Sequence, residues 1–176
     1  MIYLFDEFLV FSVLNFMTLT VDQIFNGANL FVLPFWILMI FLPNLGITRN
    51  VMKSYIPFAI LAIVYLYLFV SSINPESAAA LSNPQLDDIA QVFSDKTIAA
   101  TGWIHFLVMD LFIGRYIYWQ GQETGVWTIH SLLFCLFAGP IGLLSHILTT
   151  WINRLFFSKI KQEISPVTES STAKHS

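Results

Sequence analysis

The apolar residues of this chain fall in long blocks rather than alternating with polar residues. Four blocks, at about residues 23–42, 54–73, 98–119 and 129–152, are long enough for helices that cross a bilayer, which need about 20 residues. Only 11% of the residues are charged, so the chain has too little polar surface to cover a water-exposed fold. The pattern predicts an all-α integral membrane bundle of four transmembrane helices, formed by residues 23–157.

The two ends of the chain differ from this apolar middle. In residues 1–22 the polar side chains of Glu7, Asn15, Thr18 and Asp22 fall on one side of a helix, interrupted by Phe11. This predicts an N-terminal amphipathic helix in the membrane interface, with a short additional span as the alternative. Residues 158–176 are rich in Lys, Glu, Ser and Thr, and we expect a disordered tail there. Four crossings would then place both termini on the same side of the membrane.

The longest polar connection, residues 74–97, contains prolines and several acids that place it outside the hydrocarbon. Within it, Leu86, Ile89 and Phe93 recur at helical spacing. This spacing predicts a short surface helix at residues 85–93 with one apolar side.

Several classes of function are disfavoured by composition and motif content. The formal net charge is -3 and no basic run occurs, so we expect no nucleic-acid partner. The single cysteine, Cys135, cannot form an intrachain disulfide. No HExxH or ExxH spacing and no Gly-rich phosphate loop is present, so we expect neither a metal site nor a cofactor. The expected partners are membrane lipid and a long hydrophobic ligand.

The third apolar block carries three ionisable residues, His105, Asp110 and Arg115. Such residues are costly inside a membrane and indicate a functional site by default. At 100° per residue, each is about 140° around the helix from the next, so the three cannot form one relay on this helix alone. Asp110 falls near the bilayer midplane, where it acts chemically or pairs with a buried donor. Arg115 lies nearer one end, where a long side chain also reaches the headgroups.

The fourth block, interpreted as one helix, carries its small and polar residues within one sector. These residues are Ser131, Cys135, Gly139, Gly142, His146, Thr150 and Asn153. Such a stripe faces other helices rather than lipid, so His146 is predicted to point into the bundle. His130 is predicted to point the other way, near the membrane surface. The stripe serves helix packing, a polar site, or both.

Two further residues in the apolar blocks are candidates for binding a ligand. Asn29 is a polar side chain in the first half of the first span. Trp103 belongs to a set of aromatic residues that form interfacial belts or line a slot for a long conjugated ligand.

Taken together, the blocks resemble the neoxanthin-synthase family, the abscisic-acid-deficient-four-like membrane proteins of plants, algae and cyanobacteria. The likeness is carried by VLPFWILMIFLPN, by Arg49–Lys53 followed by SYIPFAILAIVYLYL, by GWIHFLVMDLFIGR and by HSLLFCLFAGPIGLLSHI. It extends from about Asn26 to Trp151. The order and spacing of the blocks carry it, rather than any one short motif.

The resemblance implies four transmembrane helices, no established cofactor and a role in xanthophyll conversion, from violaxanthin to neoxanthin in the plant members. The candidate catalytic residues in matching motifs are Asp110, His105 and His146, and Arg115 and His130 join Asn29 and Trp103 as candidates for binding a carotenoid. Opening an epoxide to an allenic alcohol needs an acid for the epoxide oxygen and a base for a vinylic proton. Asp110 and a bundle-facing histidine would form this pair.

Two features depart from the plant pattern. The N-terminus is short and lacks a transit peptide, and Thr128–Ile129 precedes His130 where an arginine neighbour is expected. We therefore expect a cyanobacterial protein in the thylakoid or plasma membrane. The alternative function is a non-catalytic pigment-binding or assembly subunit of a photosynthetic membrane complex. A small transporter is less favoured, because no internal repeat is evident.

Overall fold

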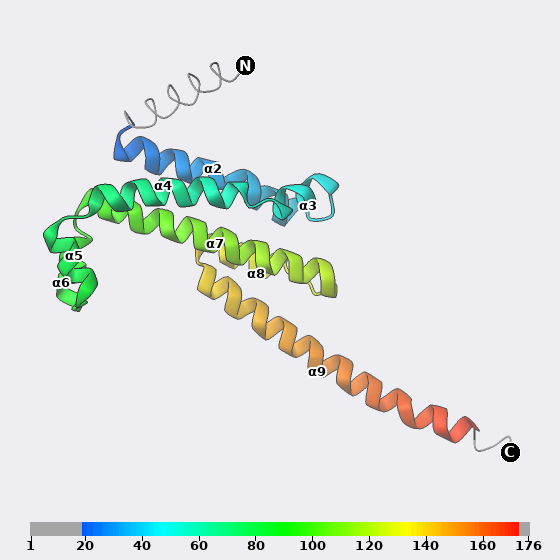
Figure 1. Ribbon diagram of the computed structural model, residues 1–176. Coiled ribbons are helices and arrows are strands. Elements are labelled where there is room, and N and C mark those ends of the chain that lie inside the picture. The colour runs from blue at the N-terminus through cyan, green and yellow to red at the C-terminus, as the bar shows by residue number, and fades with distance from the viewer. Residues whose placement is uncertain (1–18, 173–176) are drawn as a thin grey trace. The chain divides into compact units, whose positions relative to one another are not determined.

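The computed structural model describes residues 19–172, with side chains described as far as Phe156. All regular elements in this part of the chain are α-helices, and it contains no strand (Figure 1). The helices are α2 (Val21–Phe41), α3 (Gly46–Lys53), α4 (Ile56–Ser72), α5 (Pro75–Ser82), α6 (Leu86–Val92), α7 (Lys96–Thr124), α8 (Ile129–Phe137) and α9 (Gly139–Thr172). The all-α class predicted from the sequence is thus confirmed. The predicted amphipathic helix falls almost entirely on residues 1–18, outside the described residues.

Two of the described helices, α2 and α7, are long and apolar enough to cross a membrane. Helices α3 and α4 meet at 43° and supply a third crossing if the pair is one broken span. Pro57 lies in the first turn of α4, where its missing N–H costs nothing. These helices lie where the first three spans are predicted, although α7 continues to Thr124 rather than ending at 119.

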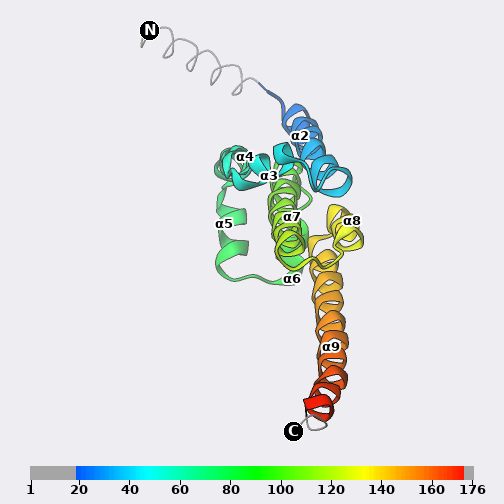
Figure 2. The ribbon, with the colours of Figure 1, turned by 90° about the vertical axis from the view of Figure 1, so that its right-hand side faces the viewer.

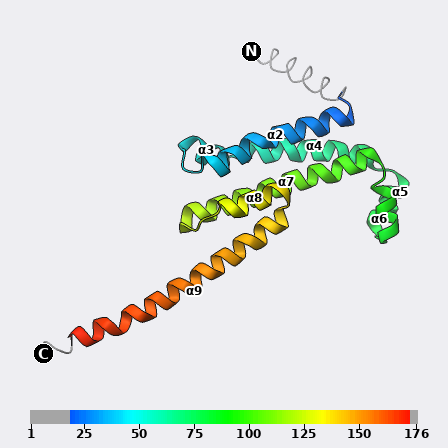
Figure 3. The same cartoon turned by 180° about the vertical axis from the view of Figure 1, so that it is seen from behind.

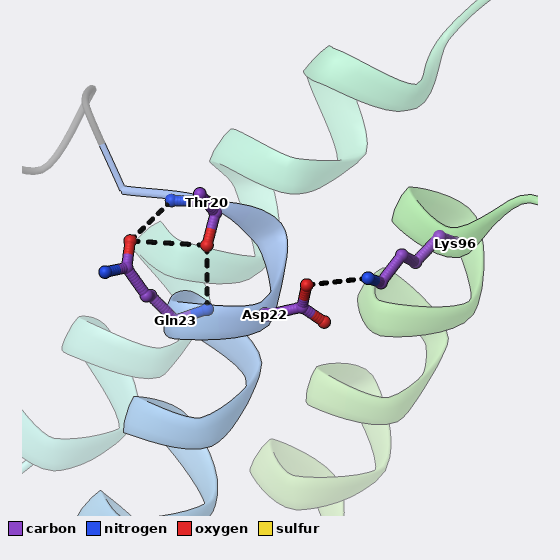
Figure 4. Close-up of polar contacts among 4 residues, drawn as sticks. All are labelled: Thr20, Asp22, Gln23 and Lys96. Atoms are coloured by element: carbon purple, nitrogen blue, oxygen red, sulfur yellow. Dashed lines mark hydrogen bonds and ion pairs between the residues drawn. The ribbon is translucent and has the colours of Figure 1, made fainter.

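The starts of α2 and α7 are fixed by local polar contacts (Figure 4). The backbone N–H of Thr20 donates to Gln23 Oε1 at 2.9 Å, and the Gln23 N–H donates to Thr20 Oγ1 at 3.3 Å. This reciprocal pair is a capping box, which satisfies N–H groups that the first turn leaves free. Lys96 Nζ lies 2.6 Å from Asp22 Oδ2 and joins the two starts. Both side chains are largely exposed, so the ion pair contributes little stability.

The described residues form two compact units, and the long helices α2 and α7 contribute to both. The first unit contains residues 19–34 and 53–109, and the second contains residues 35–52 and 110–172. In the first unit, α4 and the first parts of α2 and α7 pack through buried aliphatic side chains. These include Ile24, Ala28, Leu61, Leu68 and Ile104. Helices α5 and α6 connect the end of α4 to the start of α7 (Figure 2).

The second unit packs α3 and the last turns of α2 against the second part of α7. Its core includes Trp36, Met39, Met52, Leu111, Ile117 and Tyr118. A Cβ on Gly114 would come within 2.6 Å of the Trp36 ring, so a glycine is needed for this close approach. The Tyr118 hydroxyl donates to the carbonyl of Pro43 at 2.9 Å and fixes the connection between α2 and α3.

Helices α8 and α9 form a tight hairpin with Ala138 as the only residue between them, and α8 lies alongside α7 (Figure 3). Helix α8 has nine residues and is therefore about 13.5 Å long, less than half of the hydrocarbon thickness. The single fourth span predicted at residues 129–152 is therefore wrong. The reason is Pro140, which would remove a hydrogen bond and clash within a continuous helix but is tolerated in the first turn of α9.

Helix α9 also differs from the prediction at its other end. It continues to Thr172, through most of the segment where a disordered tail is predicted from residue 158. The segment just after 158 contains Lys, Gln and Glu, which have high intrinsic helix propensity.

Candidate functional site

The hairpin is held together by polar side chains that the predicted single helix would have placed far apart. His130 Nε2 lies 2.8 Å from Thr149 Oγ1 and 3.1 Å from Ser131 Oγ. Ser131 Oγ lies 3.2 Å from Ser145 Oγ. The Thr149 hydroxyl donates to the Ser145 carbonyl at 2.8 Å, so it accepts from His130 Nε2–H. A neutral His130 then has no proton on Nδ1, a buried atom that has no hydrogen-bond partner within the described part of the chain.

His130 therefore does not point away from the residues of α9, as the sequence predicts. The prediction was wrong because the helical wheel assumed one helix from 129 to 152. With the chain reversed at Ala138, the His130 side of α8 faces the Thr149 side of α9.

Asp110 lies at the turn of the hairpin, on α7. Its Oδ1 accepts the backbone N–H of Gly139 at 2.9 Å, at the start of α9. A carboxylate at this end of a helix satisfies a free N–H and interacts favourably with the helix dipole. The Cys135 thiol donates to the Asp110 carbonyl at 3.3 Å, so the end of α8 is also joined to α7. No hydrogen bond to Asp110 Oδ2 is found among the described residues, and the side chain is partly exposed.

His146 is buried, with 4% of its surface exposed, as the sequence predicts. Its Nδ1 has no hydrogen-bond partner among the described residues, and its ring meets the Tyr116 ring edge-on at 6.2 Å. His146 is seven residues beyond Gly139, or about 10 Å along α9. The partner of the Asp110 carboxylate is thus the Gly139 backbone rather than the His146 ring.

Arg115 is tied to the end of α3 rather than left to reach the headgroups. Its Nε donates to the carbonyl of Met52 at 2.6 Å, and Trp119 Nε1 lies 3.4 Å from the same oxygen. Met52 is the second-last residue of α3. The backbone carbonyls in the last turn of a helix lack helical donors, and a cation is favourable there. The arrangement gives Arg115 a clear role in capping α3.

In the first unit, the two predicted ligand-binding residues Asn29 and Trp103 bond to each other. Trp103 Nε1 donates to Asn29 Oδ1 at 2.9 Å, and Asn29 Nδ2 donates to the carbonyl of Phe25 at 2.8 Å. The Phe25 and Trp103 rings also lie 5.9 Å apart. This pair joins α2 to α7, and its main polar groups are already satisfied.

His105 lies on the wall of a cavity of about 250 Å³ in the first unit. Its ring is 5.7 Å from the Tyr65 ring on α4. The cavity lies between α4, α5, α6 and α7, and Ile89 and Phe93 of the predicted surface segment line it. The apolar spacing of that segment indicated a helix with one apolar side, but the sequence did not indicate that this side covers a cavity.

The candidate residues therefore fall into two groups. Asp110, His130, His146 and Arg115 belong to the second unit, and His105 belongs to the first with Asn29 and Trp103. Among the described residues, no cluster of three or more His, Cys, Asp or Glu side chains is placed to hold a metal ion.

Apolar helices of spanning length, a broken helix pair and a short hairpin with polar residues inside define a polytopic helical membrane protein. The family model described as ABA DEFICIENT 4-like matches residues 23–146, and the chain belongs to this family. The family resemblance predicted from the sequence is confirmed. All seven candidate residues lie within the matched range.

One curated relative is Protein ABA DEFICIENT 4, chloroplastic, from Arabidopsis thaliana. It is 38% identical over 133 residues, which cover 73% of this chain and 60% of the relative. The chain thus spans about 60% of the length of this relative. No solved structure gives a significant match.

Proposed function

We propose that the protein acts on a xanthophyll in a photosynthetic membrane and isomerises an epoxy-carotenoid to an allenic one. The family membership supports a role in carotenoid metabolism, and the apolar helices suit a substrate that is dissolved in lipid. The observation that carries the proposal is the carboxylate of Asp110, with one oxygen fixed by Gly139 and the other without a hydrogen bond to any described residue.

The reaction transfers one proton within the substrate and needs no oxidant or reductant. A vinylic C–H bond next to the epoxide breaks, its electron pair forms the second double bond of the allene, and the ring C–O bond opens. The epoxide oxygen takes up a proton and becomes a hydroxyl. Atoms and charge balance when one protein group removes the carbon-bound proton and returns it to the oxygen.

A single carboxylate suits this transfer better than a distant pair. The oxygen and the departing proton are close together on the substrate, so acid and base must both lie within hydrogen-bond reach of one small region. His146 lies about two turns of α9 beyond Gly139, the residue that binds Asp110, and no hydrogen bond joins the two side chains in the described part of the chain. We therefore assign Asp110 as the proton carrier. His146 supports the hairpin beside it and acts as a positioning residue.

Purified protein in lipid nanodiscs, supplied with violaxanthin and analysed by chromatography, tests this assignment. Asp110→Asn keeps an oxygen that accepts the Gly139 N–H but cannot carry the proton. We expect it to remain folded and to lose activity by about 100-fold or more. Asp22→Asn removes an exposed carboxylate and is the control. Wild-type activity in Asp110→Asn would show that Asp110 is structural.

A deletion strain distinguishes the enzyme from a non-catalytic pigment-binding or assembly subunit. If the protein is an enzyme, the deletion strain accumulates the precursor and lacks the product. If the protein is a non-catalytic subunit, the deletion strain has a normal set of carotenoids and a reduced amount of one pigment–protein complex.

A further inference from the structure

The cavity of the first unit is walled mostly by aliphatic and aromatic side chains. It lies between the second half of α4, the short helices α5 and α6, and the first part of α7. Residues that contribute apolar walls include Phe69, Ile73, Ile89, Val92, Phe93 and Ile98. A pocket of this kind, with few polar groups, is the usual form of a small-molecule site.

The serine and threonine hydroxyl groups in the wall already have partners. The Ser77 hydroxyl lies 3.1 Å from the carbonyls of Ser72 and Asn74, and the Thr101 hydroxyl donates to Thr97 at 2.7 Å. His105 makes ring contacts with Tyr65 and Phe106, and it has no hydrogen bond to the described residues. Its imidazole is therefore available to a ligand.

The cavity lies at the polar end of the apolar helices. Beyond it, the exposed acids Glu76, Asp88 and Asp95 line two further hollows beside α5 and α6. A ligand here would have its apolar body among α4 and α7 and a polar end close to water. This position suits a ligand with one hydroxyl at the end of an apolar body.

The volume of the cavity limits which part of a ligand it can hold. An apolar protein cavity of about 150 Å³ holds benzene, so about 250 Å³ holds one methylated six-membered ring but not a long polyene. The cavity is partly open, and exposed apolar residues such as Leu66 and Phe106 lie on the neighbouring faces of α4 and α7. A conjugated chain attached to the ring has an apolar path outward.

We propose that this cavity binds the hydroxylated ring end of a carotenoid, with His105 hydrogen-bonded to the ring hydroxyl. The inference rests on the proposed function for the identity of the ligand. It assigns His105 to binding the end ring rather than to the chemical step.

Direct binding to the purified full chain in nanodiscs tests this proposal, with induced circular dichroism of the carotenoid as the signal. The probes are zeaxanthin with two hydroxylated rings, β-carotene with unsubstituted rings, and acyclic lycopene. Ala80 lines the cavity and is 4% exposed, so Ala80→Leu fills it. Ala78 lies on the exposed side of the same helix, and Ala78→Leu is the matched control.

We expect Ala80→Leu to weaken zeaxanthin binding by about tenfold or more and Ala78→Leu to leave it unchanged. His105→Phe retains an aromatic ring but not the hydrogen bond, and it should reduce the preference for zeaxanthin over β-carotene by about 2- to 10-fold. Unchanged helicity by circular dichroism shows that both variants are folded.

Equal binding of lycopene and zeaxanthin would show that the cavity takes acyl-like chains and would overturn the proposal. Wild-type binding by Ala80→Leu, with the helicity of the control, would do the same. Neither result affects the isomerase assignment, which depends on the Asp110→Asn assay. Conversely, an Asp110→Asn protein that has lost violaxanthin conversion but binds zeaxanthin normally supports both assignments.

Discussion

The sharpest test of the hairpin is the replacement of Gly142 by alanine. A Cβ at Gly142 would lie 2.6 Å from Cys135 Cα and 2.7 Å from Cys135 N. Both are backbone atoms of α8, which cannot rotate away, so α8 and α9 must separate. Overpacking of this kind costs about 1–3 kcal/mol, and we expect the upper part of that range.

Gly27 provides a matched control on α2, because an added Cβ there meets nothing within 4 Å. Both substitutions gain the same helix propensity, about 0.5–1 kcal/mol, so their difference isolates the clash. At about 2–4 °C per kcal/mol for a chain of this length, a clash of about 2–3 kcal/mol should make Gly142→Ala melt roughly 4–12 °C below Gly27→Ala. The assay is thermal unfolding of the two purified variants in the same detergent.

Gly142→Leu should be far more damaging than Leu143→Ala, since it enlarges the clash while Leu143 is only half-buried. Equal melting temperatures for Gly142→Ala and Gly27→Ala would refute the close packing of α8 on α9.

Three further predictions follow from the contacts. Asp110→Leu leaves the N–H at the start of α9 without its partner and should lower the free energy of unfolding by about 1–3 kcal/mol relative to Asp110→Asn; equal denaturation midpoints would contradict the capping role. Asn29→Ala and Trp103→Phe should show a coupling of about 0.5–1.5 kcal/mol in a double-mutant cycle, and additive effects would exclude the hydrogen bond. Single cysteines at Gly125 and Arg154, introduced after replacing the native cysteine, should label from the same membrane face, because α8 is too short to cross; labelling from opposite faces would restore a fourth span.

The helices that match their predictions are those whose evidence is local. The apolar blocks that contain α2, α4 and α7 are about as long as a membrane is thick, and Pro57 stands where a helix start tolerates it. Such evidence needs no knowledge of neighbouring elements. The apolar spacing of residues 85–93 likewise predicted a helix close to α6.

The fourth block shows where this reasoning fails. The helical wheel grouped Ser131, Cys135 and Gly142 on one face, which holds only if one helix connects them. In the structure Ser131 and Cys135 face α9 from α8, while Gly142 faces back from α9. The same small and polar residues are needed in both cases, because close helix packing requires them. The sequence thus indicated a packing surface but not that the surface folds onto itself.

The sequence prediction missed the partner of Asp110 for a different reason. A carboxylate in an apolar helix needs a donor, and the prediction considered only side chains such as His146. Every residue except proline carries an N–H, but only one at a helix start is free to bond outside its own helix. Gly139 followed by Pro140 is a signal for such a start, and it could have identified the donor.

That donor also determines what Asp110 is able to do. Because the Gly139 N–H occupies Oδ1 alone, the carboxylate fixes the hairpin through one oxygen and leaves the other for chemistry. Capping requires only an acceptor, whereas proton transfer requires a group that gains and loses a proton. The amide in Asp110→Asn meets the first requirement and fails the second, so one substitution separates the structural role from the proposed catalytic one.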